Sequence, residues 1–165
     1  MPDLIQAFTP ELGFLIVGFR LGLALALGGL LGLDRERLHK AAGVRTMALV
    51  SVGAASFMIL AEELMLQARL GESIDGGRMP AAVITGVALL GGAAIIRAGG
   101  NSHGLTTAAG IWIAACVGLA AGAGSYGLAV MAFGASVLVL IALGSAKKAL
   151  TRIEEGDDVV DGYSG

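Results

Sequence analysis

The sequence predicts an all-α fold, a polytopic transmembrane helical bundle of about five helices. Of the 165 residues, 56% are hydrophobic and 15% are charged, whereas soluble domains carry about 25% charged residues. The mean hydropathy is +0.82. The apolar residues form long runs, and ~20 residues at 1.5 Å rise per residue span the hydrocarbon core of a bilayer. The runs do not alternate between polar and apolar residues, which argues against strands.

Five apolar runs can be marked, and three of them have recognisable end signals. The second run ends beside Glu62 and Glu63. The third opens at Pro80, where a missing N–H group costs least, and the fourth opens at Thr106 and Thr107, which can cap a helix. The runs cover approximately residues 12–33, 46–66, 79–96, 105–123 and 126–146.

Both ends of the chain lie outside these runs. The N-terminal segment carries Asp3 and Glu11 but no basic residue, so it lacks the basic region of a cleaved signal peptide. The C-terminal segment is rich in acidic residues and glycine, a composition typical of disorder. We therefore assign 1–146 to one transmembrane domain and 147–165 to a disordered cytoplasmic tail.

The distribution of Lys and Arg between the loops predicts the orientation. If the N-terminus lies outside, eight basic residues fall in cytoplasmic segments and only Arg69 and Arg78 fall outside. This bias requires an odd number of spans, and it predicts a bacterial inner (plasma) membrane protein with a cytoplasmic C-terminus. The eight residues are Arg35, Arg37, Lys40, Arg45, Arg97, Lys147, Lys148 and Arg152.

Glycines form a stripe along the first run. Small residues let helices approach closely in lipid, and these four glycines fall within roughly 80° of one another on a helical wheel. We expect the stripe to pack against another helix of the chain, with a homodimer contact as the alternative. Gly118 and Gly122 form a shorter stripe in the fourth run. The first stripe consists of Gly18, Gly22, Gly29 and Gly32.

Arg20 is the one charge inside the first run. Charged residues within membrane spans are costly and usually face the bundle interior. On the helical wheel Arg20 points away from the glycine stripe. We expect it to pair with Glu62 or Glu63 of the second run, and the alternative is that it snorkels to the headgroups.

Asp34 opens a charged segment between the first two runs. It lies on the same helix face as Arg20 but ~21 Å farther along the axis, too far for direct pairing. We expect Arg45 and the Thr46 hydroxyl to hold it at the cytoplasmic end.

The residues give no support for an enzyme, a cofactor or a metal site. The glycine-rich segment 85–109 lacks the Gly-Lys-Ser/Thr ending of a phosphate-binding loop. A single Cys116 and a lone His103 cannot build a metal or redox motif. With no basic face, we expect no nucleic-acid partner.

Several short motifs together resemble the MgtC/SapB family of bacterial membrane proteins, over about residues 14–146. We expect a short form without the C-terminal soluble domain of longer relatives. Asp34 stands where the family usually has Glu, and the third run lacks one glycine and the phenylalanine of the family pattern. The motifs are Arg20-Leu, Gly32-Leu-Asp-Arg-Glu36, Gly43-Val-Arg-Thr46, Asp75-Gly-Gly-Arg78, Thr85-Gly86, Gly104-Leu-Thr-Thr-Ala108 and Ile111-Trp112.

The resemblance implies a role in magnesium-limited growth and, in some pathogens, virulence-associated survival in host cells. The resemblance implies a protein that regulates other membrane machinery, including ATP synthase and transporters, more than one that transports magnesium itself. The first hypothesis is therefore a non-enzymatic regulator that acts through membrane partners and is linked to magnesium homeostasis. The alternative is an ion or small-solute transporter or channel subunit.

Two groups of residues are candidates for these roles, with the lipid bilayer and other membrane proteins as expected partners. The polar candidates are Arg20, Asp34, Arg35, Glu36, Arg45, Thr46, Glu62, Asp75, Arg78, Thr106 and Thr107. The helix-packing candidates are Gly18, Gly22, Gly29, Gly32, Gly86 and Gly104.

Overall fold

The structure, a computed structural model, describes residues 12–37, 40, 42–68, 75, 77–97 and 102–142. The side chains of some helix residues, including Asp34, Arg97 and His103, lie outside that description. The described chain is all-α, as predicted, and these ranges contain no strand. The assignments for the N-terminal segment and for the tail 147–165 fall outside the described residues.

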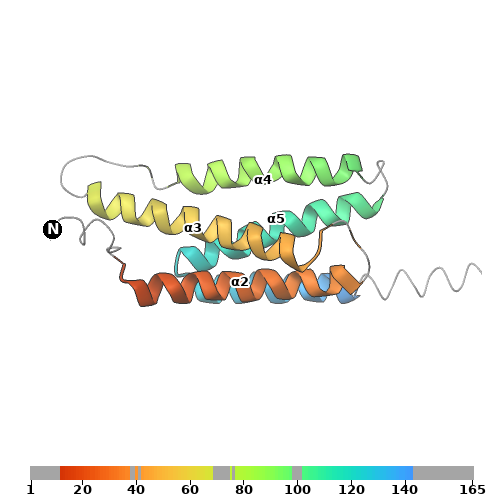
Figure 1. Cartoon of the computed structure of the whole chain (residues 1–165), viewed down its shortest axis with the longest axis horizontal. Coiled ribbons are helices and arrows are strands. Elements are labelled where there is room, and N and C mark those ends of the chain that lie inside the picture. The colour runs from red at the N-terminus through yellow and green to blue at the C-terminus, as the bar shows by residue number, and fades with distance from the viewer. Residues whose placement is uncertain are drawn as a thin grey trace, which may run out of the picture. The chain divides into compact units, whose positions relative to one another are not determined.

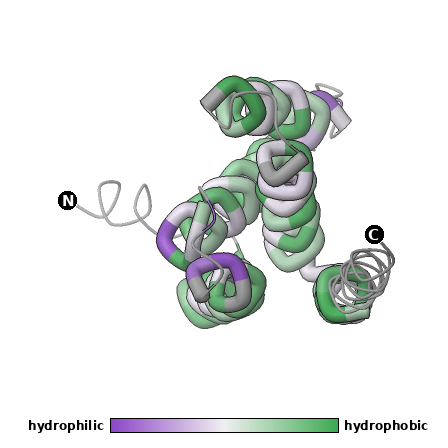
Figure 2. Tube along the Cα trace, turned by 90° about the vertical axis from the view of Figure 1, so that its right-hand side faces the viewer, coloured by the Kyte–Doolittle hydropathy of each residue, from purple (hydrophilic) through white to green (hydrophobic). Residues whose placement is uncertain are grey.

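Four long helices form most of the described chain (Figure 1). They are α2 (Phe14–Arg37), α3 (Val44–Ala68), α4 (Arg78–Arg97) and α5 (Ser102–Gly122). Each contains a stretch long and apolar enough to cross a membrane, and a shorter apolar helix, Tyr126–Ala142, follows. The five predicted runs each overlap one of these helices, and Figure 2 shows hydrophobic residues along most of their length. The predicted cap of the fourth run is wrong, because α5 begins at Ser102 and Thr106 and Thr107 lie inside it.

The chain divides into two units, Met1–Phe133 and Gly134–Gly165. In the first unit α3 packs against both α2 and α5, and α5 also packs against α4 and α2. In Figure 1, α2 and α4 lie on opposite sides of the α3–α5 pair. The second unit is described only in the last part of the helix Tyr126–Ala142.

Small residues bring α3 and α5 into backbone contact. A β-carbon on Gly118 would lie 2.1 Å from the Ser51 carbonyl oxygen, and one on Gly122 would lie 2.6 Å from the Ala55 carbonyl oxygen. Any side chain at these two positions would push the helices apart. The shorter glycine stripe therefore packs within the chain, as small residues do in membrane bundles.

Close packing of α2 against α3 also depends on glycine. A β-carbon on Gly28 would lie 2.5 Å from the Ser51 β-carbon, and one on Gly32 would lie 2.4 Å from the Val44 α-carbon. These two glycines are one helical turn apart, on the second half of α2. Gly29 is farther away, because its added β-carbon would lie 3.9 Å from Val44 Cγ1.

The predicted intrachain packing of Gly18 and Gly22 is wrong. Both residues are exposed, and a β-carbon at either would meet no described atom within 4 Å. The physical reason is Arg20, which is buried and lies on the opposite face of α2 at 100° per residue. Gly28 lies only about 80° from Arg20 on the wheel, so it can face a neighbouring helix. The homodimer alternative for Gly18 and Gly22 stays a prediction.

Candidate functional site

Arg20 lies in the second turn of α2, with only 8% of its surface exposed. Its Nη1 atom forms an ion pair with Glu62 Oε2 of α3. The same atom donates a 2.8 Å hydrogen bond to the Gly122 carbonyl oxygen at the end of α5. One guanidinium group therefore joins three helices. The predicted pairing with Glu62 is confirmed, and this burial is incompatible with Arg20 snorkelling to the headgroups.

The C-terminal end of α5 has a backbone conformation that leaves a carbonyl oxygen available to Arg20. The Ser125 N–H donates to the Ala120 carbonyl (2.9 Å), and the Gly124 N–H donates to the Ala121 carbonyl (3.1 Å). With Gly124 in the left-handed region at φ 72°, this is the Schellman arrangement that ends many helices. Carbonyls of a last helical turn lack intrahelical partners and carry negative partial charge. Arg20 satisfies one of them.

The turn after α5 covers the guanidinium group. A β-carbon on Gly124 would lie 2.8 Å from Arg20 Nη2, so a glycine is needed both for the backbone conformation and for space. The Tyr126 hydroxyl also interacts with Arg20. The Tyr126 ring packs edge-on against Phe19, with ring centroids 5.2 Å apart. The start of the fifth helix is thereby tied to α2.

Glu63 has a different role from its neighbour. Its Oε1 atom accepts a 3.0 Å hydrogen bond from the Leu12 N–H, just before α2 begins. N–H groups at a helix start need partners from outside the helix. The two adjacent carboxylates of α3 therefore both hold α2, one through a side chain and one through the backbone.

Arg35 is the second buried cation of α2, with 3% of its surface exposed. Fifteen residues separate it from Arg20, or ~22 Å along the helix. Its Nη2 atom donates a 2.9 Å hydrogen bond to the Thr107 hydroxyl of α5. A β-carbon on Gly110 would lie 2.9 Å from Arg35 Nη1, so this glycine leaves room for the guanidinium group. Both Arg35 and Thr107 were sequence candidates, and the structure brings them together.

The predicted contacts of Asp34 cannot be followed, because its side chain lies outside the described residues. Its backbone belongs to α2, and the proposed partners Arg45 and Thr46 are both exposed. The neighbouring Glu36 accepts a 3.0 Å hydrogen bond from the Val44 N–H at the start of α3. This carboxylate therefore caps α3, where negative charge is favourable.

The Asp75–Arg78 motif forms the turn that begins α4. Asp75 Oδ1 accepts a 2.9 Å hydrogen bond from the Gly77 N–H, and the Asp75 carbonyl accepts one from the Arg78 N–H at 3.2 Å. An aspartate commonly bonds the backbone two residues on in such turns. Arg78 and Thr106 are exposed, Gly104 is buried, and Gly86 is exposed on α4.

Sequence reasoning missed several residues that complete these contacts. Gly124 and Tyr126 follow an apolar run, and a glycine just after a helix is a recognisable end signal. Ser51, Gly28 and Gly110 carried no signal, because a small residue in an apolar run can face lipid or protein equally well. Within the described ranges, no three His, Cys, Asp or Glu side chains gather as a metal site would need.

Comparisons with known proteins agree with the resemblance in the motifs. The model of the MgtC family matches residues 21–149. Protein MgtC of Brucella abortus is 36% identical over 132 residues, which cover 80% of this chain and 51% of the relative. The putative magnesium transporter YhiD of Escherichia coli is 37% identical over 125 residues, covering 73% and 57%. Protein MgtC of Salmonella typhimurium is 35% identical over 133 residues, covering 80% and 53%.

The chain spans about half the length of these curated relatives. No solved structure matches it. The family model covers most of the chain, and four of its helices are long and apolar enough to cross a membrane. This membrane protein belongs to the MgtC family.

Proposed function

We propose that the chain is a non-enzymatic regulator in the bacterial inner membrane, which acts by binding other membrane proteins and is linked to magnesium homeostasis. Its N-terminus lies outside and its C-terminus in the cytoplasm. The magnesium link is supported by family membership and by a relative named as a putative magnesium transporter.

The proposal rests mainly on one observation: both buried cations of α2 are bonded to neighbouring helices. Arg20 is held by Glu62 and by a backbone carbonyl, and Arg35 is held by Thr107. They lie near opposite ends of α2, and the buried α2 side chains between them are apolar. Polar side chains inside a membrane mark ion pathways, and the buried part of α2 between Arg20 and Arg35 supplies none. The intervening buried side chains are Ala24, Leu27 and Leu31.

The free surface of α4 supports a role in binding partners. Only 11% of its spanning stretch is buried, compared with 50% for α5. Most of α4 is therefore available to lipid or to another membrane protein.

Crosslinking in the native membrane tests the proposal. A photoreactive residue placed at Leu89, an exposed position of α4, should capture a specific membrane protein during growth in low magnesium. The matched control is the same residue at Ala115, a buried position of α5. Equal capture from both positions, or capture of lipid alone at Leu89, contradicts partner binding through α4.

Growth provides the functional readout. A strain that lacks the protein should regain growth in low magnesium when the wild-type chain is supplied. Arg35→Gln should lower both the membrane level of the protein and that growth, because it removes a buried contact between α2 and α5. If the wild-type chain does not restore growth, the magnesium link is wrong for this protein. An ion or solute pathway is the competing function, and it requires flux through the purified protein.

A further inference from the structure

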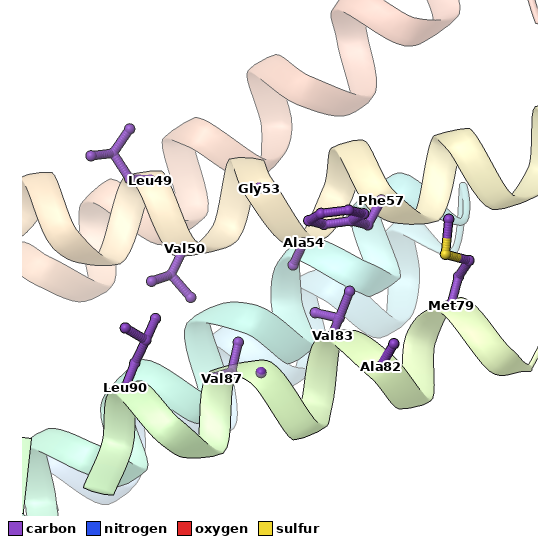
Figure 3. A pocket seen from close by; sticks show the side chains of 11 residues that line it. Leu49, Val50, Gly53, Ala54, Phe57, Met79, Ala82, Val83, Val87 and Leu90 are labelled. Carbon is purple, nitrogen blue, oxygen red and sulfur yellow. The ribbon is translucent and has the colours of Figure 1, made fainter. Parts of the chain in front are cut away.

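An apolar groove lies between α3 and α4 (Figure 3). Its volume is about 460 Å³, and only apolar residues line it, from Leu49 to Phe57 on α3 and from Met79 to Leu90 on α4. Gly53 and Gly86 belong to its walls, and a β-carbon at either position would meet no described atom within 4 Å. The missing side chains at these two glycines leave part of the groove open.

The length of the groove matches one leaflet of a membrane. On α4 it runs from Met79 to Leu90, which is ~17 Å at 1.5 Å per residue. The hydrocarbon core of a bilayer is ~30 Å thick, so each leaflet contributes about half of that. A transmembrane helix is ~10 Å across and spans both leaflets. The groove therefore fits a thinner occupant of one leaflet better than a helix.

A cation precedes the Met79 end of the groove. Arg78, the first residue of α4, is exposed and precedes Met79 of the groove wall. The nearby Asp75 carboxylate is engaged by the Gly77 N–H, and Arg78 forms no ion pair among the described residues. A guanidinium group binds phosphate through paired hydrogen bonds, and the start of a helix adds positive partial charge.

We propose that the α3–α4 groove binds an anionic phospholipid, with one acyl chain along the groove and the headgroup phosphate at Arg78. The apolar wall explains the acyl chain, the length explains why it stops within one leaflet, and Arg78 supplies charge complementary to the phosphate. This surface is separate from the contacts of Arg20 and Arg35 and does not include Leu89, so lipid binding and partner capture are tested at different residues.

Retention of lipid by the purified protein tests this assignment. The full chain is reconstituted in vesicles of phosphatidylglycerol and phosphatidylcholine, extracted in mild detergent and analysed by native mass spectrometry. Gly86→Leu fills the groove and should abolish the bound-lipid peak. Gly92→Leu is the matched control, since Gly92 lies on the same helix, has open space and does not line the groove. It should retain lipid as the wild type does.

The headgroup is tested by Arg78→Gln, which leaves the groove wall unchanged. It should lower the preference for phosphatidylglycerol over phosphatidylcholine about fivefold, the factor that one basic residue contributes at an anionic surface. Unchanged retention by Gly86→Leu overturns the groove assignment, and an unchanged preference in Arg78→Gln overturns the phosphate contact. If Gly86→Leu instead converts a dimer to a monomer with the same lipid content, the groove holds a second copy and the proposal fails.

Discussion

At the scale of single residues, Arg20 shows how a charge is accommodated inside an apolar bundle. Burying a cation is unfavourable unless its hydrogen bonds and its charge are satisfied. Glu62 and the Gly122 carbonyl supply both, from two different helices. Removing Glu62 leaves the buried Arg20 cation without its counter-charge, so the cost of that substitution exceeds the net contribution of the pair.

Substitutions at the pair should therefore be strongly non-additive. Arg20→Ala and Glu62→Ala should each destabilise the bundle by about 3–5 kcal/mol, whereas the double variant should lose much less than the sum. Arg20→Lys should rescue only partly, since lysine lacks the planar fork of arginine. Unfolding in detergent measures all four, with Arg45→Ala at an exposed site as the control. Additive losses would show that the pair does not interact.

Gly124 offers a second test at the residue scale. Gly124 and Gly13 both have positive φ, 72° and 76°, so alanine at either position should cost about 1–2 kcal/mol from backbone strain. At Gly124 the new β-carbon would also lie 2.8 Å from Arg20 Nη2, whereas Gly13 has open space. We expect Gly124→Ala to lower the melting temperature in detergent more than Gly13→Ala does. Equal shifts would mean that the turn does not cover Arg20.

At the scale of helices, the sequence predicts well where each helix lies along the chain, but it predicts poorly which helix faces contact one another. Long apolar runs mark α2 to α5, because length and hydropathy depend only on local sequence. The contact face of α2 was predicted only in part, because Gly32 packs against α3 as expected but Gly18 and Gly22 do not. A glycine can be small for a close helix contact or can simply face lipid. Arg20 was the better guide: its buried face correctly predicted the Glu62 contact, whereas no pattern distinguished Gly28 from Gly29.

The glycine contacts yield a prediction at the helix scale. Gly118→Leu should strongly destabilise the bundle, because any β-carbon there would lie 2.1 Å from a backbone oxygen of α3. Gly22→Leu should be neutral or slightly stabilising in the monomer, since its surroundings are open and glycine is a poor helix former. Thermal unfolding in detergent compares the two. A large loss for Gly22→Leu with none for Gly118→Leu would reverse the assigned faces.

At the scale of the whole molecule, the helical bundle and its orientation in the membrane are inferred from different observations. The helices follow from hydropathy, and the family follows from motifs and relatives. Orientation follows only from the basic residues in the loops. The contacts of Arg35 with Thr107 could not be predicted, because the sequence does not specify which faces of α2 and α5 meet. Asp34 remains a candidate on sequence grounds alone.

A reporter fusion tests the orientation. An enzyme that is active only in the cytoplasm, fused after Gly165, should be active, because eight basic residues favour the cytoplasmic side and two the other. A periplasm-active reporter at the same position should be silent and is the matched control. The opposite result would reject the five-span arrangement with the N-terminus outside.

The buried charges of Arg20 and Arg35 join the helices of the bundle, and we propose that they form no ion path. The most direct test is magnesium flux into sealed vesicles that contain the purified wild-type chain and a magnesium-sensitive dye. Vesicles that contain folded Arg20→Lys protein serve as a matched control, and empty vesicles set the background. We predict that the wild-type chain gives no flux above empty vesicles. Magnesium entry that scales with the amount of wild-type protein, and falls in Arg20→Lys, would show that the buried charges line an ion path.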